Sequence, residues 1–188
     1  NKTGTITGDV TPEYAVLSPE LIKRINQHYP NVKIILLLRN PIEREWSNLK
    51  MWHKRVKKVK SIDEVDPKFL IAQAKQQNNL SEYCETIENW SSIIPKERIL
   101  IRFFDQIIDN PHDLLNEVYS FLGIQEDVNS GVEKMVANKG LPGKIPAEIQ
   151  SILFSKYEKD LRQLEKMFAH RPINYPAKWL EEETSATK

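Results

Sequence analysis

The sequence is poor in the residues that form disulfides and metal sites. Its single cysteine, Cys84, excludes an internal disulfide, and the chain has no CxxC pair and no cluster of histidine and cysteine. Structural zinc sites need several such ligands at close spacing. The sequence therefore predicts no metal.

Long apolar runs are missing as well. No stretch of eighteen or more apolar residues occurs, and the N-terminus is polar and lacks a leading methionine. These features predict no transmembrane segment and no signal peptide, so we expect a cytoplasmic chain cut from a longer protein. Sequons at Asn1, Asn79 and Asn89 leave the Golgi lumen as the alternative, if the parent is a membrane-anchored eukaryotic protein.

An excess of charge of one sign is also absent. The 27 Lys and Arg residues nearly balance the 26 Asp and Glu residues, which argues against a nucleic-acid-binding protein. Residues 50–60 are the exception, with six cations and no acid. They form either a solvated helix end or a patch that faces an acidic substrate or a cofactor. With 40% hydrophobic residues, the 188-residue chain can build one substantial core.

The most informative stretch is residues 33–49, KIILLLRNPIEREWSNL. Residues 34–38 are apolar without alternation, which is typical of a strand covered on both faces in a parallel α/β sheet. Asn40 fits a helix N-cap, Pro41 the first helical position, and Glu43 the third, from which its side chain can reach back to the cap. The pattern predicts a buried strand that leads directly into a helix.

A candidate phosphate site lies at this junction. Arg39 stands at the predicted strand end, toward which the helix would direct its first free N–H groups and its positive dipole end. Ser47 follows two helical turns later. A guanidinium and a hydroxyl together suit a phosphate monoester. The alternative is that Arg39 is a surface ion-pair partner and Ser47 a solvated helix residue.

The segment LLRNPIEREWS resembles the 3′-phosphate-binding segment of sulfotransferases that use 3′-phosphoadenosine 5′-phosphosulfate (PAPS), whose pattern is L-R-[ND]-P-x-x-R-x-x-S. The matching residues are Arg39, Asn40, Pro41, Arg44 and Ser47. Residues 8–14, GDVTPEY, resemble the G-[DE]-x-[TS]-P-x-Y element of bacterial and Golgi-type members, with Val10 where lysine is frequent. The resemblance implies that Arg39 and Ser47 bind the 3′-phosphate and that Arg44 is structural.

The family resemblance also implies a fold. Residues 98–104, RILIRFF, read as a second strand, and Asn110-Pro111 starts a helix that ends at Gly123. We expect an α/β, P-loop nucleotide-kinase-like three-layer fold with a central parallel sheet. Residues 147–168 read as a long closing helix with apolar residues at helical spacing.

A loop predicted over residues 126–146 is similar to the basic, glycine-containing loop that closes over the nucleotide in this family. Lys139 and Gly140 match its Lys-Gly pair, so the resemblance makes them candidate cofactor-binding residues; a plain surface loop is the alternative. Lys2-Thr3-Gly4-Thr5 imitates the family's 5′-phosphosulfate loop, K-x-G-T-T. We reject that assignment because no strand precedes it and no helix follows it.

Residues 1–188 are therefore expected to be a single sulfotransferase-like domain, the C-terminal two-thirds of the family's domain. The resemblance implies transfer of a sulfuryl group from PAPS to a hydroxyl or amine of a small-molecule or glycan acceptor, with adenosine 3′,5′-bisphosphate (PAP) as product. No catalytic base is identified, and we expect the chain as given to transfer poorly. The alternative is a non-catalytic nucleotide-binding or scaffolding module that keeps only the 3′-phosphate site. A phosphoryl-transfer kinase is disfavoured because GxxxxGK[ST] is absent from the sequence.

Overall fold

The computed structural model describes residues 6–76, 79–124, 140–169, 173 and 175–181. Two parallel strands form the sheet of this part of the chain, β1 (Ile34–Leu38) and β2 (Ile99–Phe103). Their register pairs Ile34 with Ile99 and Leu38 with Phe103. The predicted pair of neighbouring parallel strands is confirmed, with slightly shorter bounds.

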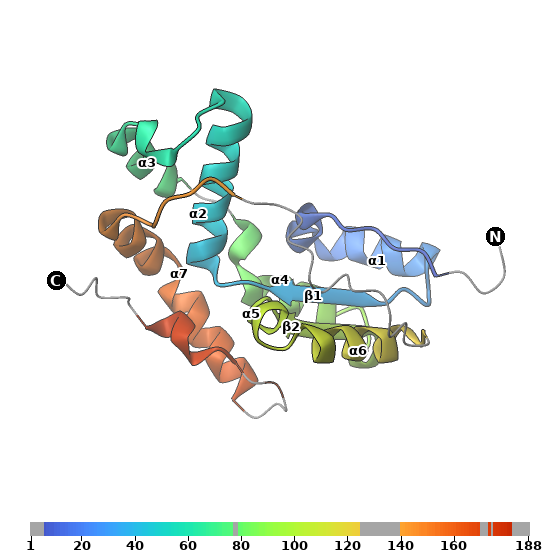
Figure 1. Cartoon of the computed structure of the whole chain (residues 1–188). Coiled ribbons are helices and arrows are strands. Elements are labelled where there is room, and N and C mark those ends of the chain that lie inside the picture. Colours follow the sequence, from blue (N-terminus) through green and yellow to red (C-terminus); the bar gives the residue numbers. More distant parts are fainter. Residues whose placement is uncertain (1–5, 77–78, 125–139, 170–172, 174, 182–188) are drawn as a thin grey trace.

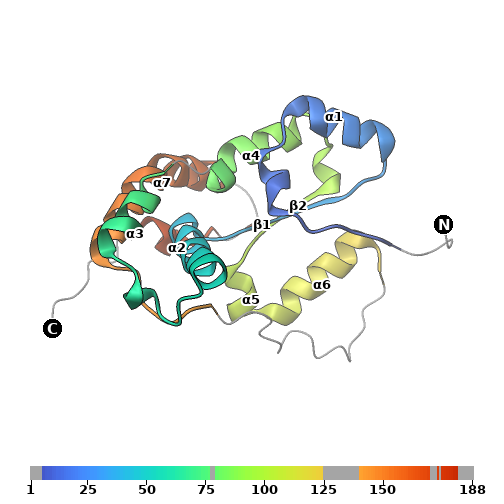
Figure 2. The same cartoon turned by 90° about the horizontal axis from the view of Figure 1, so that it is seen from above.

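Helices cover the sheet from two sides, which gives three layers (Figure 2). Helices α1 (Pro19–His28) and α4 (Tyr83–Ser91) pack on one face, where Ile34, Leu36 and Ile99 contact a buried cluster of Ile22, Trp90 and Ile94. Helix α6 (Pro111–Leu122) lies on the other side and contacts β2. The predicted α/β architecture is confirmed.

A second group of helices packs at the carboxyl end of the strands (Figure 1). It comprises α2 (Pro41–Trp52), α3 (Pro67–Ala74) and α7 (Ala147–Phe168). The long helix α7 has the predicted bounds and buries one stripe of residues: Ile149, Leu153, Tyr157, Leu161, Leu164 and Phe168. This helix therefore organises the larger of the two hydrophobic cores.

Shorter helical elements connect these parts. They are η1 (Pro12–Val16), η2 (His53–Lys57), η3 (Ile62–Glu64), η4 (Asn79–Ser81), η5 (Lys96–Arg98), α5 (Asp105–Asp109) and η7 (Ala177–Leu180). Element η2 is a π-helical continuation of α2, and within it Val56 is 57% exposed. Near the C-terminus, the rings of Phe103, Phe168 and Trp179 meet edge to face, which fixes η7 against α7.

The prediction that the first strand is covered on both faces is wrong for part of β1. Ile35 is 39% exposed and Leu37 is 42% exposed. In the described part of the chain β1 pairs with β2 alone, and α6 contacts β2 on that side. A continuous apolar run shows that both faces of a strand are suited to burial. It does not show that helices of the described residues pack on both faces.

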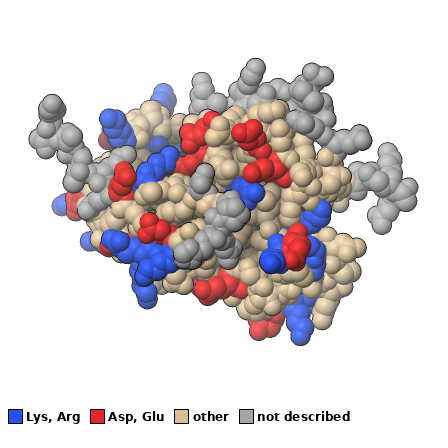
Figure 3. All heavy atoms as spheres, turned by 90° about the horizontal axis from the view of Figure 1, so that it is seen from below, with Lys and Arg blue, Asp and Glu red and all other residues tan. Residues whose placement is uncertain are grey.

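The described residues contain neither a membrane-spanning helix nor a cluster of metal ligands. None of their helices is long and apolar enough to cross a membrane, and no three of their His, Cys, Asp and Glu side chains are grouped to hold a metal ion. On the face shown in Figure 3, basic and acidic side chains are interspersed. That face therefore lacks the stripe of one sign that is typical of nucleic-acid-binding surfaces.

Gly143 provides a test of how the 140–146 segment is anchored. Its φ is +122°, and a Cβ added there would lie 2.6 Å from Cγ2 of Ile62. We expect Gly143→Ala to lower the free energy of unfolding by about 1–3 kcal/mol, measured by denaturant titration. Gly140→Ala is the matched control because nothing lies within 4 Å of its added Cβ. Equal effects of the two substitutions would contradict this view of the segment.

Candidate functional site

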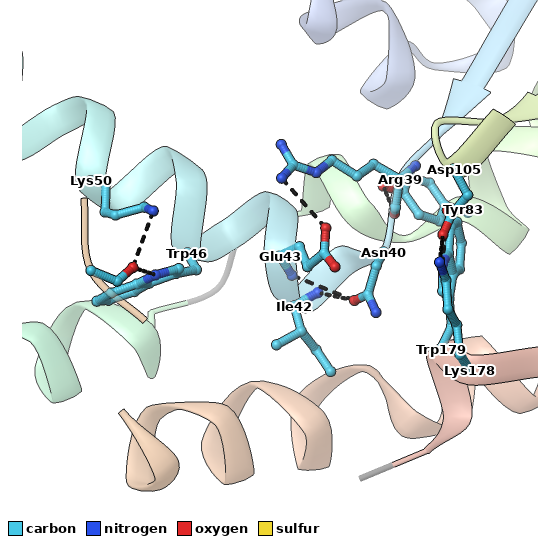
Figure 4. Close-up of polar contacts among 11 residues, drawn as sticks. Arg39, Asn40, Ile42, Glu43, Trp46, Lys50, Tyr83, Asp105, Lys178 and Trp179 are labelled. Atoms are coloured by element: carbon cyan, nitrogen blue, oxygen red, sulfur yellow. Dashed lines mark hydrogen bonds and ion pairs between the residues drawn. The ribbon is translucent and has the colours of Figure 1, made fainter. Parts of the chain in front are cut away.

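The junction between β1 and α2 is closed by its own cap (Figure 4). The Oδ1 atom of Asn40 accepts hydrogen bonds from the backbone N–H groups of Ile42 at 2.9 Å and Glu43 at 3.4 Å. Pro41, at the first helical position, has no N–H group to offer. The cap is confirmed, but the expectation of free first-turn N–H groups is wrong, because the asparagine side chain already satisfies them. Any anion here must depend on side chains and the helix dipole.

Arg39 presents its guanidinium at this junction. Its central carbon lies 4.8 Å from the centre of the Phe104 ring, and its Nη2 lies 3.5 Å from Oε2 of Glu43. The Glu43 carboxylate thus extends to Arg39, whereas the sequence predicted that it would reach back to the cap. The Nε–H group of Arg39 is buried, and none of the described residues accepts a hydrogen bond from it. A buried donor of this kind is costly unless a further group binds it.

Tyr83, at the start of α4, holds the backbone of Arg39. Its hydroxyl donates to the Arg39 carbonyl at 2.7 Å and accepts from the Arg39 N–H at 3.4 Å. In turn, the carboxylate of Asp160 in α7 accepts from the backbone N–H groups of Tyr83 and Cys84, both at 3.2 Å. The orientation of Arg39 therefore depends on two helices that are distant in sequence.

Ser47 lies on the same face of α2 as Glu43, the residue that pairs with Arg39. Successive spacings of four and three residues separate Glu43, Ser47 and Lys50, so these three side chains share one side of the helix. Glu43 is the one that contacts Arg39. Ser47 is half-buried, and none of the described residues hydrogen-bonds to its hydroxyl. The structure thus places both predicted phosphate-binding side chains along one helix face.

The segment that follows the predicted nucleotide loop crosses α2. Lys139 lies outside the described residues; Gly140 lies within them and is exposed. Leu141 is buried, and the carbonyl of Gly143 accepts from Nε1 of Trp46 and Nζ of Lys50, each at 3.4 Å. These contacts hold the segment after Gly140 on the same helix as Ser47.

Two residues at the site escaped the sequence reasoning. Phe104 underlies the Arg39 guanidinium, although it read only as part of an apolar strand. Lys50 was counted in the basic run, but its ammonium lies 5.7 Å from the centre of the Trp46 ring. Burial lowers the pKa of Lys50, and the nearby positive charge of Arg39 lowers it further. The missed signal was helical spacing, which puts Lys50 one turn beyond Ser47.

Other candidate side chains have structural roles. Nη1 of Arg44 donates to Oγ of Ser81 at 2.9 Å and pairs with Glu45 at 2.8 Å, which confirms its expected role in tying α2 to a neighbouring segment. His53 is 1% exposed, with Nε2 2.7 Å from Oε1 of Gln73, so it cannot reach a substrate. Burial raises the pKa of the Cys84 thiol, which makes it a poor nucleophile.

Comparison with known proteins identifies the family. The model of the sulfotransferase domain matches residues 15–140. The chain belongs to the sulfotransferase family. The match includes the segment that carries Arg39 and Ser47, whereas Gly143 and Asp160 lie beyond it.

The chain is similar in sequence to animal proteins and in structure to a bacterial one. Heparan sulfate glucosamine 3-O-sulfotransferase 6 of Mus musculus is 25% identical over 142 residues, and that of Homo sapiens is 24% identical. In both cases 74% of this chain is covered, and the chain spans 41% of the relative's length. A sulfotransferase from Alicyclobacillus acidocaldarius matches 90% of this chain and 65% of its own, with a TM-score of 0.64 and 17% identity. That likeness supports the predicted P-loop-like fold.

The Tyr83 hydroxyl can be tested separately from any ligand. We expect Tyr83→Phe to lower the free energy of unfolding by about 1–3 kcal/mol, because two backbone groups of Arg39 lose their partner. Tyr29→Phe is the control, since this tyrosine is 67% exposed and should change stability by less than about 0.5 kcal/mol. Urea titrations of both variants provide the comparison. A neutral Tyr83→Phe would show that the hydroxyl does not hold the junction.

Proposed function

We propose that residues 1–188 form a single sulfotransferase-like domain that binds PAPS and moves its sulfuryl group to a hydroxyl or an amine. The observation that carries this proposal is the buried, unpartnered Nε–H of Arg39. Its guanidinium lies over Phe104 beside the positive end of α2, which suits a phosphate dianion. The residues present therefore fit the 3′-phosphate of PAPS.

The protein's own residues bind and orient in this proposal. Arg39 and Ser47 hold the 3′-phosphate, and Gly140, with Lys139 before it, borders the nucleotide from the crossing segment. When bound, PAPS supplies an activated sulfuryl group that an acceptor oxygen or nitrogen can take by in-line displacement, leaving PAP. Fixing one end of a donor nucleotide limits the positions of the other end, and such orientation contributes much of the rate of a two-substrate reaction.

The acceptor is proposed to be a small molecule or a glycan. The animal relatives carry the name of a glycan, heparan sulfate. In this chain Lys54, Arg55, Lys57, Lys58 and Lys60 are all exposed at and after the end of α2. Exposed cations raise the local concentration of an anionic acceptor, so an acidic glycan is the first acceptor to test.

Binding of PAP tests the phosphate site. By titration calorimetry, Arg39→Ala should weaken PAP binding by about 1.5–3 kcal/mol, the range for hydrogen bonds to a charged group. Arg55→Ala is the matched control, because Arg55 is exposed in η2, beyond the end of α2, and this variant should bind like the wild type. Unchanged affinity in Arg39→Ala would remove Arg39 from the site.

Removing the charge of Glu43 should strengthen PAP binding, whereas Arg39→Ala should weaken it. Its carboxylate pairs with Arg39 at 3.5 Å and is 56% exposed, so the pair itself contributes little stability. A bound phosphate would have to displace this carboxylate or lie beside it. We therefore expect Glu43→Gln to bind PAP several-fold more tightly at low ionic strength, where repulsion between anions is least screened. Weaker binding would mean that Glu43 supports the ligand.

Sulfuryl transfer needs its own assay. The full-length protein that contains this chain should be incubated with labelled PAPS and a panel of phenols, alcohols, amines, and neutral and acidic glycans. We expect label in at least one acceptor, and less of it after Arg39→Ala. Tight PAP binding without transfer to any acceptor would instead support a nucleotide-binding module.

A further inference from the structure

Lys50 occupies an unusual position on the candidate site's helix face. Its ammonium lies over the Trp46 ring, 5.7 Å from the ring centre, and its hydrogen bond to the Gly143 carbonyl, at 3.4 Å, is long. That carbonyl is shared with the indole N–H of Trp46. Figure 4 shows Lys50 beside Trp46 toward the C-terminal end of α2, and the Arg39 guanidinium beside Glu43 at the start of the same helix.

The charges around Lys50 are unbalanced. Among the described residues, no carboxylate lies within ion-pair distance of its ammonium, and the charge that acts on it most is the like charge of Arg39. The side chain is also half-buried, which disfavours its charged form. Glu43, on the same helix face, pairs with Arg39, and it leaves Lys50 as the cation of that face with no carboxylate partner among the described residues.

A bound phosphate would remove this imbalance. The first-turn N–H groups of α2 are occupied by Asn40, so a phosphate there must find its donors on side chains. Arg39 supplies them from one end of the face, and Ser47 lies one turn before Lys50. Lys50 is the remaining cation on that face, and its long bond to a shared carbonyl is easily exchanged for a charge-assisted bond.

We propose that Lys50 is a third phosphate-contacting residue, which together with Arg39 and Ser47 selects nucleotides that carry a 3′-phosphate. This inference rests on the proposed function, because it concerns the same nucleotide site. The Trp46 ring holds the lysine stem and the Gly143 carbonyl holds the ammonium until the phosphate binds. Lys50 is thus a specificity-determining residue, and it takes no part in the chemical step.

Calorimetry with two nucleotides tests this role. Lys50→Met keeps an unbranched apolar stem for Trp46 and removes the charge. We expect it to weaken the binding of PAP about tenfold, the lower end of the effect of a charged hydrogen bond. The binding of adenosine 5′-monophosphate, which lacks the 3′-phosphate, should stay the same. The ratio of the two affinities should therefore fall about tenfold, which a general loss of folding would not produce.

Two further variants sharpen the comparison. Lys57→Met is the matched control, because the Lys57 ammonium also lies over a tryptophan ring, 5.8 Å from the centre of Trp52, but beyond the candidate site. It should leave the affinity ratio unchanged. Lys50→Arg keeps the charge and should restore most of the preference for PAP. Thermal melting of each variant checks that the fold is retained.

The possible failures can be told apart. If Arg39→Ala loses PAP binding while Lys50→Met retains the wild-type ratio, the role of Lys50 is wrong and the phosphate site stands. If Lys50→Met weakens both nucleotides equally, Lys50 supports the fold or the shared part of the ligand, which also overturns the proposal. If the wild-type chain binds neither nucleotide, both the proposed phosphate site and the role of Lys50 are wrong.

Discussion

The backbone of Arg39 is held by one hydroxyl group, and much of the site depends on it. Tyr83 bonds both the N–H and the carbonyl of Arg39, while Asp160 of α7 caps the helix that begins with Tyr83. Burial raises the pKa of Tyr83, which keeps its hydroxyl protonated and able to donate. The contacts made by Tyr83 and Asp160 therefore fix the backbone of Arg39, which follows the last residue of β1.

This constraint changes how an anion would be bound. The Asn40 side chain occupies the N–H groups of Ile42 and Glu43, so an anion at this end of α2 depends mainly on side chains. Arg39, Ser47 and Lys50 lie along one face of α2, and the segment after Gly140 is attached to the same face through Gly143. A site made of side chains is easier to tune by substitution than one made of backbone N–H groups, because each donor can be changed alone.

The partial exposure of β1 contrasts with the burial of the helices at its carboxyl end. The larger core lies at the carboxyl end of the strands and is dominated by α2 and α7, whereas Ile35 and Leu37 of β1 stay partly exposed. The chain spans less than half the length of its animal relatives and about two thirds of the bacterial structure. The junction that carries Arg39 is supported within the described residues, independently of the exposed side of β1.

The sequence by itself determined the local structure and the family. Apolar runs, the Asn40-Pro41 cap and the spacing of apolar residues in α7 predicted both strands and the helices α2, α6 and α7, because these signals act between near neighbours in the chain. The pattern around Arg39 and Ser47 indicated the sulfotransferase family. These parts of the prediction needed no knowledge of distant contacts.

Only the tertiary structure decided which groups meet. The Tyr83 hydroxyl, the Phe104 ring and the Gly143 carbonyl reach the site from segments far apart in the sequence, and no local pattern records such pairings. The partial exposure of Ile35 and Leu37 and the contacts of Lys50 with Trp46 and Gly143 follow from the same packing. Side-chain chemistry can be read from a sequence, but the environment that sets charge and access is made by contacts between distant residues.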